Sequence, residues 1–312
     1  MSNKTNYGVI SDIHRDSRII HPTLDILTAL GAEKFIVNGD IGKRQKSLED
    51  TLRYTAEILD ALGNSGKECF IQPGSHETIE AFQPILNTFC EKYSNLVSAI
   101  EVPKIENENH HLVFLPGSDF VCGGGYQIKN DENIETGLYK TPSGLMYYQN
   151  MNDLRKLVSD GEKTISICHV PRKFDRVEGA VDVAYFAENS DGSIIPGVFL
   201  ENQIRQKYGE ISNEEVKHIA SQNGLTLREE NRGNEGLRDL YKELGVTKAV
   251  NGHFHESGHR AHDENVNPIQ QGTLVDELYW NSGCLDAGQT GILNVDEGLV
   301  SYRNINLEEH LK

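Results

Sequence analysis

Short apolar runs alternate with longer segments of helical periodicity along the first third of the chain. The runs at 7–10, 35–37 and 69–72 are short and rich in β-branched and aromatic residues, a pattern that predicts buried strands. Between them, leucines spaced three and four apart predict amphipathic helices at 22–31 and 48–62. Strand and helix alternate with short connections, so we expect parallel β/α/β units in this part of the chain.

The remainder of the chain predicts further strands and one long insertion. The strands are expected at 112–115, 164–168, 249–251, 291–295 and 299–303, with the last two joined as a hairpin. The stretch between the strands at 164–168 and 249–251 is longer than one crossover requires. We therefore expect a single domain over residues 1–312 with a cap-like insertion at 171–245.

Acidic and imidazole side chains follow five of the predicted strands. They are Asp12, His14, Asp40, His76, Glu77, His169, His253 and His255. Because the carboxyl ends of parallel strands line one crevice, we expect these groups to converge. Residues two apart in an extended segment point to the same side, so Asp12 with His14, and His253 with His255, would each serve one place.

The donor set indicates a metal centre. Carboxylate oxygens mixed with imidazole nitrogens suit divalent transition metals such as Mn, Fe, Co or Zn rather than calcium. Two aspartates and four histidines exceed what one ion with open positions requires, so two ions that share a carboxylate fit better. We expect two divalent ions, with manganese favoured.

Five motifs in a fixed order make this signal specific. They are Asp12-Ile13-His14, Gly39-Asp40, Gly74-Ser75-His76-Glu77, His169 and Gly252-His253-Phe254-His255. Their order resembles that of the calcineurin-like metallophosphoesterases. The resemblance implies an α/β fold of four layers (αββα), in which a β-sandwich of two mixed sheets is flanked by helices.

The resemblance also implies a role for each motif. One metal ion would be held by Asp12, His14, Asp40 and His255. Asp40 would bridge to a second ion, whose other ligands would be His169, His253 and Ser75. His76 would be the catalytic histidine that contacts the phosphoryl group. The implied activity is a phosphodiesterase or phosphomonoesterase that uses a bridging hydroxide for in-line attack on phosphorus.

Ser75 departs from the family pattern, which has asparagine at this position. A serine hydroxyl is shorter than an asparagine amide and a weaker ligand, so the second ion would be bound less tightly. This leaves open an alternative function, a catalytically weakened metal-binding scaffold. A nuclease is a third hypothesis, because a DNA-repair exonuclease of the superfamily shares the motifs.

Charge and composition limit the classes of substrate and partner that the protein is expected to bind. The net charge of −17 argues against a nucleic acid and for a small phosphoester substrate, and the sequence leaves the oligomeric state open. The chain has no apolar stretch long enough to span a membrane, its first apolar run starts too early for a cleaved signal peptide, and its five cysteines lack any CxxC pair. We expect a cytoplasmic protein with reduced, mostly buried thiols.

A few polar residues outside the motifs are weaker candidates. Arg172 follows His169 closely and Asn231 begins a segment expected to line the site, so both are candidate substrate contacts. His259 and His262 follow the last motif, and we expect them to be solvated neighbours rather than ligands. The run Gly123-Gly-Gly125 is expected to be a flexible turn.

Overall fold

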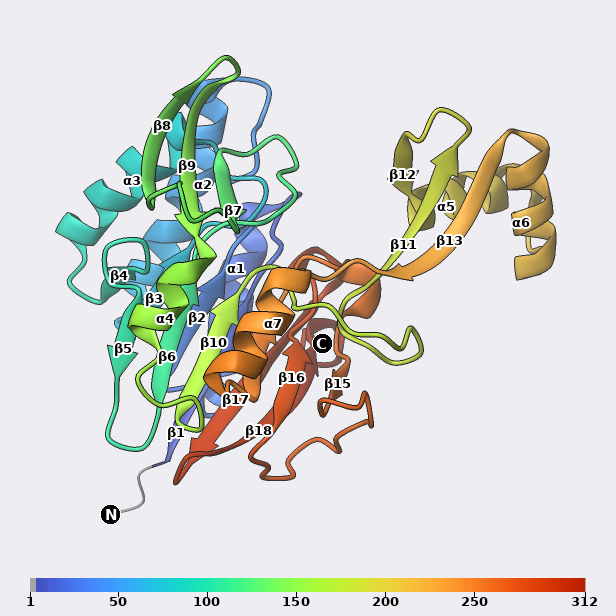
Figure 1. The fold of residues 1–312 in the computed structure, drawn as a ribbon. Helices are drawn as coiled ribbons and strands as arrows, with labels where there is room; N and C mark the ends of the chain where they lie inside the picture. The colour runs from blue at the N-terminus through green and yellow to red at the C-terminus, as the bar shows by residue number, and fades with distance from the viewer. Residues whose placement is uncertain (1–3, 312) are drawn as a thin grey trace.

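Two six-stranded mixed sheets form the centre of the protein in a computed structural model that describes residues 4–311 (Figure 1). The first sheet has the spatial order β18 (Leu299–Asn306), β17 (Gln289–Asp296), β1 (Thr5–Ile10), β2 (Lys34–Asn38), β3 (Cys69–Gln72) and β4 (Leu96–Ser98). The second has the order β15 (Ala261–His262), β16 (Leu278–Asn281), β14 (Lys248–Asn251), β10 (Thr164–Cys168), β6 (His111–Leu115) and β5 (Lys104–Glu106). In the first sheet β1 to β4 run parallel, and β17 and β18 add an antiparallel edge on one side only. In the second sheet β16, β14, β10 and β6 run parallel, and β15 and β5 are antiparallel edge strands.

Helices cover the outer face of each sheet, which gives the four layers that the family resemblance implies. The first sheet is covered by α1 (Ile20–Ala29), α2 (Leu48–Asn64) and α3 (Ile79–Lys92), and the second by α4 (Leu154–Leu157) and α7 (Glu235–Leu244). Short 3-10 turns lie at Ser17–Ile19, Met151–Asp153, His255–Ser257, Leu285–Ala287 and Leu307–Glu309. In residues 4–311, no helix is both long and apolar enough to cross a membrane.

Alternation along the strands explains why the layers form. In β2, Ile36 faces the core between the sheets, whereas Phe35 and Val37 pack beneath the helices of the first sheet. The same alternation in β10 places Ile167 between the sheets and Cys168 beneath the helices of the second. Because both faces of these strands are buried, each strand is continuously apolar, as is typical of parallel sheets.

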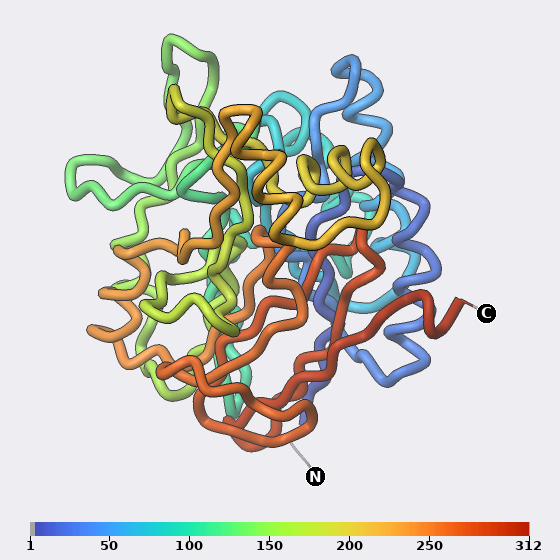
Figure 2. Tube along the Cα trace, turned by 90° about the vertical axis from the view of Figure 1, so that its right-hand side faces the viewer, coloured from blue at the N-terminus to red at the C-terminus, as the bar shows by residue number. Residues whose placement is uncertain are grey.

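A segment of residues 183–231 projects from the sandwich (Figure 1) and has its own small core. In Figure 2 this segment lies in front of the sandwich. It consists of β11 (Val183–Asn189), β12 (Ile194–Pro196), α5 (Gly197–Tyr208), α6 (Asn213–Gln222) and β13 (Leu225–Asn231). It lies within the predicted insertion at 171–245, whose remaining helix, α7, packs on the second sheet instead. A further small sheet is made by β7 (Tyr126–Lys129), β9 (Gly144–Asn150) and β8 (Gly137–Thr141).

Candidate metal centre

The loops that leave β1, β2 and β14 bend in the same way. Asp12, Asp40 and His253 are each the second residue after the strand ends, and their φ angles are 59°, 56° and 68°. A non-glycine residue in this left-handed region is uncommon and tends to mark a functional site. The bends turn three potential ligands back over the strand ends, and His169 joins them directly after β10.

Close backbone approach at two glycines makes room for these side chains. A Cβ atom at Gly74 would lie 2.5 Å from Asp40 Oδ1, and one at Gly252 would lie 2.6 Å from Asp12 Oδ2. Both distances are too short for any side chain to be accommodated without a shift of the carboxylate. The glycines therefore allow the loops to pass directly beside the two aspartates.

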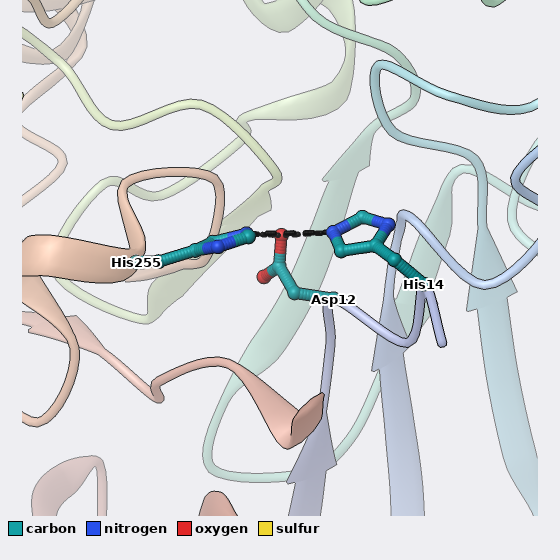
Figure 3. Close-up of side chains that lie close together, drawn as sticks. All are labelled: Asp12, His14 and His255. Carbon is teal, nitrogen blue, oxygen red and sulfur yellow. Dashed lines mark hydrogen bonds and ion pairs between the residues drawn. The ribbon is translucent and has the colours of Figure 1, made fainter. Parts of the chain in front are cut away.

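Asp12, His14 and His255 form the first group (Figure 3). Oδ1 of Asp12 lies between the two rings, 3.1 Å from His255 Nε2 and 3.7 Å from His14 Nε2. The two Nε2 atoms are 3.4 Å apart. Burial alone would raise the pKa of Asp12, but the surrounding histidines, His169 foremost, hold it well below its usual range.

Asp40, His169 and His253 form the second group. His169 is fully buried, and its Nδ1–H donates to the carbonyl oxygen of Asn38 at 2.7 Å. Its Nε2 has no hydrogen-bond partner within residues 4–311, yet it lies 3.1 Å from Asp40 Oδ2 and 3.9 Å from Asp12 Oδ1. A buried nitrogen that faces two carboxylates requires a cation there, either a proton or a metal ion.

The raised pKa of His169 has the same cause, the two carboxylates that face its Nε2. Burial lowers the pKa of this imidazole, but the carboxylates of Asp40 and Asp12 outweigh burial and raise it to about 10. In His255, the hydrogen bond to Asp12 overcomes burial and raises the pKa to about 12. The pocket is thus strongly selective for positive charge, and its oxygen and nitrogen donors fit divalent transition metals.

Asp40 connects the two groups. A third set of close ligand atoms comprises Asp40, His14 and His76, so the carboxylate lies within reach of both sides of the centre. Backbone N–H groups of Ser75 and His76 donate to Asp40 Oδ1 at 2.5 and 2.9 Å. These bonds fix the orientation of the carboxylate between the groups.

Ser75 lies beside the second group. Its hydroxyl donates to Asp40 Oδ2 at 2.9 Å, and the side chain is fully buried. The hydroxyl oxygen is therefore next to the shared carboxylate.

His76 lies on the exposed side of the centre. Its side chain is 21% exposed, and its Nε2 is 3.9 Å from Asp40 Oδ2. Burial lowers the pKa of His76 to about 4, so the ring is neutral at pH 7. A neutral imidazole at the mouth of the centre can offer one N–H to a bound oxyanion.

The prediction that His253 and His255 serve one place is wrong, because the segment is not extended. His253 has a left-handed backbone and His255 begins a 3-10 turn, so the two rings reach different groups. Asp12 and His14 do share a group, but through the left-handed bend at Asp12 rather than through extended backbone.

Arg172 and Asn231 are not brought to the metal groups. Arg172 is buried, its guanidinium is 2.8 Å from Glu264, and it stacks near the rings of Phe174 and Tyr279. Asn231 donates from Nδ2 to Asp182 Oδ1 at 2.7 Å, at the base of the projecting segment. The contacts of both residues are with other parts of the protein, away from the metal groups.

His262 differs from the expectation of a solvated neighbour. It is fully buried, whereas His259 is partly buried and has its Nε2 3.0 Å from the carbonyl oxygen of Thr290. Nε2 of His262 accepts a hydrogen bond from Val181 N at 3.0 Å, and its ring meets Phe174 edge to face. The polar residues around His262 in the sequence gave no sign that its side chain turns inward.

Two supporting residues had no assigned role in the sequence. Glu77 is buried and joins two metal-site loops, since it accepts hydrogen bonds from the backbone of Ile41, Gly42 and Gly74 at 2.5 to 2.9 Å. Asn281, at the end of β16, donates from Nδ2 to the carbonyl oxygens of Gly252 and Phe254 at 3.2 and 3.0 Å. Both residues hold the ligand loops in place.

The expected flexible turn at Gly123 to Gly125 is instead packed against the loop after β3. Backbone N–H groups of Gly124 and Gly125 donate to the carbonyl oxygens of Ser75 and Glu77 at 3.1 and 2.7 Å. A Cβ atom at Gly124 would lie 2.5 Å from the oxygen of Ser75. Glycine is thus required there for close packing beside the site.

The β-sandwich and the histidine and carboxylate groups at its strand ends fit a metal-dependent phosphoesterase. The calcineurin-like phosphoesterase family model matches residues 5–257, and the chain belongs to this family. A search among curated proteins found no match.

Solved structures support the fold. The protein TT1561 of Thermus thermophilus is similar with a TM-score of 0.55 at 10% identity, over 96% of this chain and 98% of that one. A dimetal phosphatase from Danio rerio, LOC 393393, is similar with a TM-score of 0.50 at 13% identity, over 97% of this chain and 98% of that one. At these identities the likeness extends to the fold alone.

Proposed function

We propose that this protein is a phosphohydrolase with a dinuclear metal centre, acting on a phosphomonoester or a phosphodiester. The observation that carries the proposal is the position of Asp40, whose carboxylate belongs to donor sets on both sides of the centre. One shared carboxylate between two sets of donors is the arrangement expected for two ions acting on one phosphoryl group.

The residues divide between the two ions. Asp12, His14 and His255 would hold one ion, His169, His253 and Ser75 the other, and Asp40 both. We favour manganese, because hard carboxylate oxygens and neutral imidazoles are combined in each set. When bound, the cations would lower the pKa of a water molecule and neutralise charge on the phosphoryl oxygens.

His76 would contact the phosphoryl group of the substrate as a neutral hydrogen-bond donor rather than as a positive charge. Its neutral ring lines the cavity beside the two groups. In that state an N–H directed at a phosphoryl oxygen would stabilise the charge that develops during the reaction.

The substrate and setting are part of the proposal. A net charge of −17 favours a small phosphoester over a nucleic acid, whose polyanion the chain would repel. All five cysteines are unpaired, which suits a reducing compartment, and we place the protein in the cytoplasm.

The test compares wild-type protein with His76→Ala, using p-nitrophenyl phosphate and bis-p-nitrophenyl phosphate with added Mn²⁺. We expect turnover by the wild type and a kcat lower by about 10²- to 10⁴-fold in the variant, as for loss of a group that acts in the transition state. Metal content should stay the same in both proteins. An unchanged kcat would refute the role of His76, and loss of metal would make His76 a ligand.

The alternative functions predict different results in the same assay. A catalytically weakened scaffold would bind metal without turnover, and Ser75→Asn would then restore activity by supplying the amide ligand. A nuclease would cleave single-stranded DNA with a steep salt dependence.

A further inference from the structure

A cavity of about 670 Å³ opens directly from the metal groups, and its two sides differ in chemistry. One side presents the candidate ligands and His76. The rest of the lining is mostly apolar and comes from separate parts of the chain: Phe120, Tyr185, Phe186, Ile194, Ile195 and Pro196. Its charged residues are Asp119, Arg232 and Glu256. The cavity is therefore continuous from a cation-binding floor to an apolar wall.

Part of the apolar wall is exposed, although Phe186 within it is buried. Phe120 is 60% exposed and Ile194 is 48% exposed, so neither side chain is buried in a hydrophobic core of the protein. An exposed apolar surface that lines a cavity marks a binding site more often than an isolated exposed side chain does. The metal groups account for the polar end of this cavity but leave its apolar wall without a partner.

Both parts of the wall are held in position. The residue before Phe120, Asp119, is largely buried and accepts a hydrogen bond from Asn234 Nδ2 at 2.8 Å. The strand that carries Ile194 to Pro196 pairs with β11, whose first residue accepts a hydrogen bond from Ser257 Oγ at 2.7 Å. The wall is thus anchored to elements on either side of the metal groups.

Arg232 adds a cation near the apolar wall. Its guanidinium lies 4.6 Å from the centre of the Phe186 ring and 3.0 Å from Glu230 Oε2. A guanidinium that already stacks on one ring is suited to stack on a second, because its planar faces are weakly hydrated.

We propose that this cavity binds the non-phosphate part of the substrate and that this part is an aromatic ring. The phosphoryl group would lie at the metal groups, and the ring would contact Phe120 and the wall formed by the projecting segment, which would act as a cap. The proposal rests on the phosphohydrolase function. A polyol would leave its hydroxyl groups facing apolar side chains, so the wall selects against it.

The test uses Phe120→Ala and a matched control, Phe199→Ala. Phe199 is 57% exposed on α5 of the same projecting segment but lies outside the cavity lining, so both substitutions remove an exposed ring. The substrates are 2-naphthyl phosphate and phenyl phosphate, whose leaving groups have similar acidity but different apolar area, and glycerol phosphate as the polar case.

We expect Phe120→Ala to raise KM for 2-naphthyl phosphate about tenfold, which corresponds to the loss of roughly one buried ring contact. The effect should be smaller for phenyl phosphate and absent for glycerol phosphate, and Phe199→Ala should behave as wild type. Equal KM values for the two aryl substrates in the wild type, or equal effects of the two substitutions, would overturn the proposal.

Binding measured without turnover separates this proposal from the enzymatic function. Calorimetry of Mn²⁺-loaded protein with 2-naphthylmethylphosphonate should show about tenfold weaker binding in Phe120→Ala, with methylphosphonate unaffected. If this difference is found but no substrate is turned over, the phosphohydrolase function fails and the aromatic site stands. If 2-naphthylmethylphosphonate and methylphosphonate bind with equal affinity, the aromatic site is refuted, whether or not a substrate is turned over.

Discussion

At the scale of single residues, the site depends on backbone conformations that side chains normally avoid. Asp12, Asp40 and His253 are left-handed at the same position after three different strands. Such conformations persist only where the surroundings enforce them. Here the surroundings include loop-to-loop hydrogen bonds, such as Ile13 N to the carbonyl oxygen of Asp40 at 2.8 Å and His253 N to Asp12 Oδ2 at 3.2 Å.

A buried histidine outside the centre gives a pH prediction. Burial lowers the pKa of His262 to about 4, and its Nε2 accepts the Val181 N–H, so protonation would break that bond. The unfolded chain takes up this proton near pH 6.5, so the stabilising contribution is complete above that pH and is lost as the pH falls toward 4.

We expect wild-type protein without metal to lose about 2 to 3 kcal/mol more unfolding free energy than His262→Gln between pH 7 and pH 4. Urea unfolding followed by fluorescence measures this, because Trp280 is the single tryptophan and is fully buried. Parallel losses in the two proteins would show that His262 does not titrate as described.

At the scale of elements, the sequence pattern predicted the strands that are buried on both faces and the turn that requires residues with positive φ angles. The predicted hairpin is confirmed, with Glu297 and Gly298 at φ 50° and 85° between β17 and β18, as a tight two-residue turn requires. Helix α7 ends at Gly245, which has φ 69°, the left-handed conformation in which helices commonly stop.

Other elements were not predictable for identifiable reasons. The strands β7, β8 and β9 are short and partly exposed, so they lack a clear apolar pattern. Helix α3 contains Pro84, which weakens a helical pattern, and it was not predicted. The inward turn of His262 depends on tertiary contacts that no spacing rule encodes. The division of His253 and His255 depends on a local bend that their spacing does not encode, although the family resemblance assigned them to different ions.

Two helix N-caps provide a prediction at this scale. The Asn234 side chain accepts from Leu237 N at 2.9 Å to cap α7 and also donates to Asp119, whereas Ser212 caps α6 through a capping box. Replacing either by alanine should lower the unfolding free energy by about 1 kcal/mol.

Only the α7 cap should affect catalysis. Asn234→Ala frees the loop that carries Phe120, so KM for an aryl phosphate should rise, whereas Ser212→Ala should leave KM unchanged. Steady-state kinetics and urea unfolding on both variants measure these effects. Equal KM values in the two variants would show that Asn234 does not position the loop that lines the cavity.

At the scale of the whole molecule, the sandwich brings the ends of two sheets to one place. Asp12 and Asp40 follow strands of the first sheet, and His169 and His253 follow strands of the second. The two carboxylates are buried together with His169, an arrangement that is costly unless positive charge is bound between them. The ordered motifs predicted this meeting, because residues far apart in sequence share one edge of the fold.

The dinuclear centre is tested most directly by the number of metal ions bound per chain, measured by elemental analysis after saturation with Mn²⁺ and removal of free metal. We predict two ions for wild-type protein and fewer than two for Asp40→Asn, because that substitution removes the charge shared by both groups. Asp182→Asn, a matched change in a buried carboxylate outside the centre, should retain two ions. One ion or none in the wild type, or two in Asp40→Asn, would contradict a dinuclear centre built around Asp40.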